Sequence, residues 1–130
     1  MLHHILLLLS GIISGLILFQ SAINAPLIFG TLDAHHAGPL IRRIFPVLFR
    51  VVGVIAVGML AASVLGDAGP VAIGVSALTL VCAVVCNSLV PATNRATDTG
   101  NQSLFNRLHH ASVALTLIAL LVNLCWVFVS

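Results

Sequence analysis

The six histidines of this chain occur as three adjacent pairs, and imidazole is a common ligand for metal ions and for haem iron. The pairs are His3-His4, His35-His36 and His109-His110. Neighbouring residues of a helix point about 100° apart, so two adjacent imidazoles seldom bind one ion together. We therefore expect one member of each pair to face the protein and the other to face lipid headgroups. The simpler alternative is that all six are interfacial side chains without a ligand.

Cysteines supply a second ligand type. Two of them, Cys82 and Cys86, are four residues apart and share one face of a helix. We predict that they approach histidines in an inner cluster, whose candidate ligands are Cys82, Cys86, His35, His36, His109 and His110. A second candidate cluster, at the other end of the helices, consists of His3, His4 and Cys125. Sulfur and nitrogen ligands suit reduced copper and also zinc. Alternatively, the cysteines pack as small apolar residues.

Amides within apolar stretches are a further functional signal, because polar groups are costly in lipid. The candidates are Gln20, Asn24, Asn87 and Asn123. They either line the interior of a helix bundle or join helices by hydrogen bonds. All three acids, Asp33, Asp67 and Asp98, fall in predicted loops, which disfavours a proton-coupled carrier. No phosphate loop, nucleophile elbow or dinucleotide fingerprint occurs, so we expect no catalysis without a cofactor.

Composition identifies the solvent that surrounds these residues. The chain has 130 residues, of which 60% are hydrophobic and 6% charged. A soluble domain carries about 25% charged residues, so lipid is the expected environment. A net charge of +2 is too small to indicate nucleic acid. About 20 apolar residues cross a bilayer, and the sequence supplies four such spans, at about residues 2–29, 44–65, 71–90 and 107–128.

These spans predict one all-α domain over residues 1–130, a membrane four-helix bundle that runs up-down-up-down. We expect polar loops at residues 30–43 and 93–106, and a tight turn from Gly66 to Pro70. The first apolar run has no preceding Arg or Lys, so it is interpreted as a span and not as a signal peptide. Gly11-x-x-x-Gly15 and Gly58-x-x-x-Ala62 would let helices approach closely, within the bundle or with a partner.

Arginine placement predicts the orientation. Arg42, Arg43 and Arg50 flank the first loop, whereas Arg95 and Arg107 flank the third, and neither terminus carries any. The positive-inside rule then places both of these loops in the cytoplasm and both termini outside. We expect Arg50 to extend its side chain to the inner headgroups. The predicted location is a bacterial inner membrane, and the inner ligand cluster would lie on the cytoplasmic side.

Three segments resemble a family of unknown function that includes human transmembrane protein 205 and bacterial four-span proteins. They are residues 24–29, residues 37–50 with their Ile44-Phe45-Pro46 and Phe49-Arg50 motifs, and residues 94–112 with Asn94-Arg95 and Phe105-x-x-Leu108-His109. The resemblance implies that His109 is the histidine of interest, with Arg50, Asn94 and Arg95 beside it. Platinum-drug resistance linked to the human member implies metal or thiol handling.

Three hypotheses follow. The first is handling of copper or haem at the cytoplasmic-side cluster, with His109 and His110 as candidate haem ligands. The second is a non-catalytic accessory subunit of a larger membrane complex or a homo-oligomer. The third is a haem-dependent membrane oxidoreductase, which a more distant resemblance to four-span copper-resistance and haem-binding oxidase families implies. That resemblance also implies a haem-ligating histidine near the middle of the first span, which this chain lacks.

Overall fold

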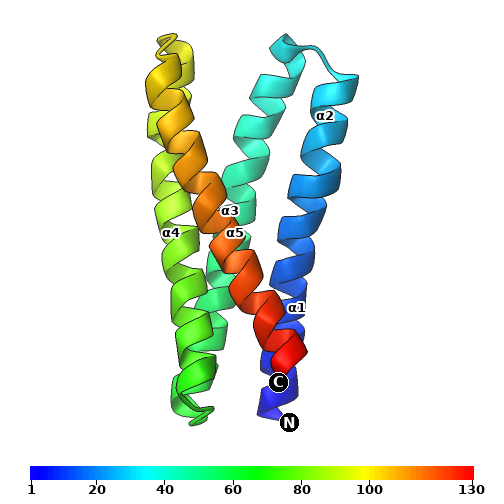
Figure 1. The fold of residues 1–130 in the computed structure, drawn as a ribbon, viewed down its shortest axis with the longest axis vertical. Helices are drawn as coiled ribbons and strands as arrows, with labels where there is room; N and C mark the ends of the chain where they lie inside the picture. Colours follow the sequence, from blue (N-terminus) through cyan, green and yellow to red (C-terminus); the bar gives the residue numbers. More distant parts are fainter.

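The computed structural model describes residues 1–130 and contains helices but no strands. This confirms the predicted all-α class. Four helices run side by side, and both termini lie at one end of the molecule (Figure 1). The elements are α1 (Leu2–Leu18), η1 (Phe19–Asn24), α2 (Ala25–Thr31), α3 (Ala34–Leu65), α4 (Pro70–Asp98) and α5 (Gln102–Val129).

The first helix is continuous through α1, η1 and α2 but contains one π-helical segment. Pro26 has no backbone N–H and its ring crowds the preceding turn, so a regular α-helix is disrupted there. In η1 the N–H of Ala25 donates to the carbonyl of Gln20, five residues earlier. Such π-bulges often mark functional positions. Here the bulge lies beside the buried side chain of Gln20, which accepts a 2.7 Å hydrogen bond from the Asn24 amide.

The two predicted polar loops are mostly helical, so these predictions were wrong in extent. Only Leu32 and Asp33 separate α2 from α3, and α4 continues through Pro91 to Asp98. Polar side chains mark where a helix leaves the apolar layer, but they do not end it, because its backbone stays hydrogen-bonded. Thr93 even donates to the carbonyl of Leu89. The predicted turn between α3 and α4 is present.

Side chains at the helix starts supply the caps that the longer helices need. Asp33 accepts a 3.0 Å hydrogen bond from the N–H of His36 at the start of α3. Asn101 accepts a 3.1 Å bond from the N–H of Leu104 at the start of α5. Each cap satisfies a backbone donor that has no partner within its helix. Gly100, in the turn before α5, has φ +68°, a conformation that glycine adopts without strain.

Packing follows the chain order and is then closed by α5. Helix α3 packs along α4, and α4 packs along α5. Helix α5 crosses diagonally, so that it also contacts α1 (Figure 1). The shared core consists of apolar side chains such as Leu6, Ile13, Ala56 and Met59. Small core residues let the helices approach closely where no hydrophobic effect drives them together in lipid.

The outer surface is apolar along most of the length of the bundle. All four helices are long and apolar enough to cross a membrane. Large apolar side chains are exposed on each of them, and examples are Leu8, Val54, Val81 and Leu121. An apolar surface of this extent fits lipid and not water. The chain is therefore built as a multi-pass membrane protein.

Candidate functional site

The centre of the bundle contains a hydrogen-bonded polar network that joins three helices. Asn123 of α5 is completely buried, and its Oδ1 accepts a 2.7 Å bond from the hydroxyl of Ser10 in α1. Its Nδ2 donates to Thr79 Oγ1 of α4 and to the carbonyl of Ala119, both at 2.8 Å. Thr79 donates in turn to the carbonyl of Val75. These bonds satisfy each of the three side chains, so the network joins helices and leaves no group for chemistry.

The sequence predicted Asn123 as an interior amide but missed Ser10 and Thr79. Their signal was weak, because Ser and Thr in membrane helices often only hydrogen-bond the carbonyl four residues earlier. Ser76 does this, at 2.7 Å from the carbonyl of Ala72. Nothing local distinguishes Thr79 from Ser76. Only the position of α5 makes one of them a partner of Asn123.

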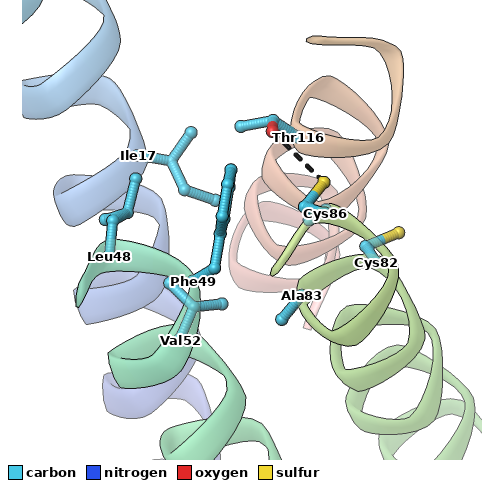
Figure 2. A pocket seen from close by; sticks show the side chains of 9 residues that line it. Ile17, Leu48, Phe49, Val52, Cys82, Ala83, Cys86 and Thr116 are labelled. Carbon is cyan, nitrogen blue, oxygen red and sulfur yellow. Dashed lines mark hydrogen bonds between the residues drawn. The ribbon is translucent and has the colours of Figure 1, made fainter. Parts of the chain in front are cut away.

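Cys86 lies in a small interior pocket toward the other half of the bundle (Figure 2). Its thiol donates to the carbonyl of Ser112 at 3.6 Å and lies 3.9 Å from the hydroxyl of Thr116. Apolar side chains, among them Ile17 and Phe49, close the pocket to a volume of about 10 Å³. This volume is at the lower limit for one water molecule. A haem bound to this chain would have to lie outside the bundle core.

Cys82 is buried as well, but its sulfur points away from the pocket (Figure 2). Both thiols therefore pack as small apolar groups in the core, which is the simpler of the two predicted roles. Cys125 differs from them because it is exposed near the C-terminal end of α5.

The structure does not assemble the predicted inner cluster. It places no group of three or more His, Cys, Asp or Glu side chains where they could hold one metal ion. Cys86 faces Ser112 and Thr116 in the core, whereas His109 and His110 are exposed on α5. His109 is seven residues from Thr116, so it lies on the same side of α5 but about 10 Å further along the helix axis, and this offset separates it from Cys86. His109 instead stacks on the ring of Phe105, with centroids 5.5 Å apart.

The other histidine pairs are exposed too. His36 Nδ1 lies 2.7 Å from the carboxylate of Asp33, and His35 lies beside it. At the opposite end, His3 and His4 lie together, and the ring of His3 meets the edge of Trp126 at 6.3 Å between centroids. Cys125 does not join them in a group of three ligands. All three pairs are therefore exposed on the outside of the bundle.

Polar residues near the first and third loops form a dispersed set. Arg42 of α3 donates a 2.6 Å hydrogen bond to Asp98, at the polar end of α4 beyond its apolar stretch. This hydrogen bond, aided by the positive charge of Arg42, lowers the pKa of the Asp98 carboxyl. Asn94 is half-buried and Arg95 is exposed, and neither forms an ion pair. The Arg42–Asp98 pair alone joins the loop-side ends of α3 and α4 among these residues.

Arg50 and Asn87 belong to a different feature, an open groove between α3 and α4. We call it the α3–α4 groove, and its main lining residues are Arg50, Gly53, Val54, Ala83, Val84 and Asn87. Its volume is about 360 Å³, within the range of about 300–1,000 Å³ that is typical of ligand sites. The sequence analysis selected Arg50 and Asn87 but did not place them together.

Comparison with known families gives one match. Residues 8–95 match the model of a domain of unknown function, DUF4149. No curated protein and no solved structure matches the chain. The matched region includes most of α1, all of η1, α2 and α3, and most of α4, which is more than half of the chain. The chain therefore belongs to the DUF4149 family.

Proposed function

We propose that this protein is a non-catalytic membrane subunit that binds an apolar helix of another membrane protein through the outer face of α1. The observation that supports this proposal is the exposed stripe of Leu8, Gly11, Ile12, Gly15 and Phe19, which we call the α1 glycine face. Its spacing repeats every three or four residues, so these residues share one side of the helix.

The two glycines leave room for a close helix neighbour. A Cβ placed on Gly11 or Gly15 would meet no atom within 4 Å. The second small-residue spacing is different, because Gly58 is open but Ala62 packs against the core. Paired glycines that allow backbones to approach are a common basis of helix association in lipid. Of the two motifs, only the one on α1 presents both small residues outward.

The interior gives this proposal further support. Its side chains are apolar or hydroxyl- and amide-bearing, apart from two thiols, and its central network is fully hydrogen-bonded. A general acid or base inside the bundle would need a titratable group that faces a cavity. The pocket beside Cys86 has a volume of only about 10 Å³. Association is therefore the better-supported activity.

Copper binding at His109, haem binding and the relation to human transmembrane protein 205 stay predictions from the sequence. The same holds for a cytoplasmic placement of the first and third loops and for a bacterial inner membrane. Elemental analysis of the purified protein tests the copper prediction, and His109→Ala should lower any copper that is found. A Soret absorption band tests the haem prediction.

The association test uses the protein purified from its native membrane in mild detergent. Native gel electrophoresis and mass spectrometry of the excised band identify the chains that migrate with it. We expect a complex larger than the monomer, which the Gly11→Leu/Gly15→Leu variant loses. The matched control is Gly58→Leu/Gly74→Leu, because both of these glycines are also exposed with no atom within 4 Å of an added Cβ.

A wild-type protein that migrates only as a free monomer would contradict the proposal. Equal loss of the complex in the control pair would contradict the assignment to α1. Circular dichroism of both variants establishes that their helix content is unchanged.

A further inference from the structure

The α3–α4 groove has a polar end and an apolar end. Arg50 of α3 lies at the polar end, together with Asn87 and Ser88 of α4. Val57 and Leu80 line the other end, because α3 and α4 run antiparallel. The polar end is the one nearer to the first and third loops, and all five arginines of the chain lie in this half of the bundle.

Small residues form the floor of the groove. A Cβ placed on Gly53 would lie 3.8 Å from the Cβ of Ala83, so the two helices are close there. Val54 and Val84 stand on either side and are 73% and 54% exposed. The result is an apolar channel, open to the surrounding lipid, whose width is set by two small residues. Its shape suits an unbranched hydrocarbon chain.

The charge at the polar end has no partner within the protein. Arg50 donates from Nε to the carbonyl of Pro46 at 3.2 Å, which holds the side chain but leaves the terminal nitrogens of the guanidinium free. The only ion pairs of the structure are His36–Asp33 and Arg42–Asp98. A guanidinium in an apolar setting strongly favours an anionic partner, and its planar fork fits a phosphate.

The neighbouring polar groups on α4 also face this end. The amide of Asn87 is half-buried and makes no hydrogen bond within the chain, although an unpaired amide in lipid is costly. Ser88 donates to the carbonyl of Val84 at 2.8 Å, and its oxygen can still accept. A cation with an adjacent amide and hydroxyl, above an apolar channel, matches a phosphate with its glycerol esters above an acyl chain.

We propose that the α3–α4 groove binds one anionic phospholipid, with its phosphate at Arg50 and one acyl chain along the valines. The charge is complementary, because Arg50 is unpaired and the loop-side half of the bundle carries five arginines but only Asp33 and Asp98 as acids. This site is independent of the α1 glycine face, so either proposal can fail without the other.

The test measures lipid binding by native mass spectrometry of the detergent-purified protein. The probes are phosphatidylglycerol, which is anionic, and phosphatidylcholine, which is zwitterionic. We expect the wild type to bind one phosphatidylglycerol about tenfold more tightly than phosphatidylcholine, because the two phosphates are alike but the choline cation is repelled by Arg50, whereas the glycerol headgroup is not. Arg50→Gln should abolish this preference, and Arg50→Lys should retain part of it.

The matched control is Arg107→Gln, which removes another exposed and unpaired arginine near the same end but outside the groove. It should leave the preference unchanged. Val54→Trp should block the channel and weaken binding of both lipids while leaving every charge in place. This position is exposed, so the variant keeps the test informative if Arg50→Gln does not fold.

Equal binding of the two lipids by the wild type would overturn the proposal. The proposal would also be overturned if Arg107→Gln reduced the preference as much as Arg50→Gln, because the attraction would then be a diffuse charge effect. Unchanged binding in Val54→Trp would exclude the groove as the site of the acyl chain.

Discussion

Replacement of Asn123 by Leu should destabilise the bundle, because this side chain joins α5 to both α1 and α4. Leu has a similar branched shape, so the main change is the loss of the bonds to Ser10 and Thr79. Hydrogen bonds between membrane helices contribute about 0.6 kcal/mol each on average and about 1.7 kcal/mol at most. The two lost bonds therefore predict a decrease of about 1–3 kcal/mol in the free energy of unfolding.

The assay is unfolding by SDS in mixed micelles, followed by circular dichroism. A double-mutant cycle with Ser10→Ala isolates the bond between Ser10 and Asn123, and we expect a coupling energy of about 0.6–1.7 kcal/mol. Asn106→Leu is the control, since Asn106 is an exposed amide that only accepts a bond from Gln102. Its effect should stay within about 0.5 kcal/mol.

A coupling energy near zero would refute the reasoning. An Asn123→Leu variant as stable as the wild type would also refute it, because apolar packing would then replace the network without loss of stability. Either result would show that the three buried polar side chains are compatible with the bundle but do not stabilise it.

Three shorter predictions concern other parts of the chain. A Cβ on Gly66 would lie 2.9 Å from the backbone carbonyl oxygen of Ala62, so Gly66→Ala should lower stability in the SDS assay by about 1–3 kcal/mol, whereas Gly74→Ala, in open space, should not. Ser130→Cys in a Cys125→Ser background places a thiol beyond the predicted fourth span, so a membrane-impermeant maleimide should label intact cells there if the C-terminus faces outward; labelling only after lysis would reverse the predicted orientation. The lowered pKa of Asp98 means that its ion pair contributes stability above the ordinary aspartate pKa of about 3.9 and loses it as the pH falls through the lower folded value. The small stability difference between wild type and Asp98→Asn should therefore vanish in acid, and a difference that persisted there would point to another cause.

Much of the fold is determined by the local sequence. Apolar stretches long enough to cross a bilayer specify four helices, and the glycine-proline turn separates α3 from α4. Backbone hydrogen bonds in a helix join residues four apart, so these elements depend on their own sequence. The predicted loops were longer than the observed ones. Polar composition was taken to mark the end of a helix, although it marks only the end of the apolar layer.

What only the tertiary structure decided is which helix faces meet. Ser10 and Asn123 are 113 residues apart, and their contact requires that α5 cross the bundle onto α1. The same packing sets Cys86 against Thr116 and leaves His109 exposed two turns further along α5, which separates the ligands that spacing alone had joined. A helix rotates about its axis without loss of any internal hydrogen bond, so only packing against its neighbours fixes where its side chains point.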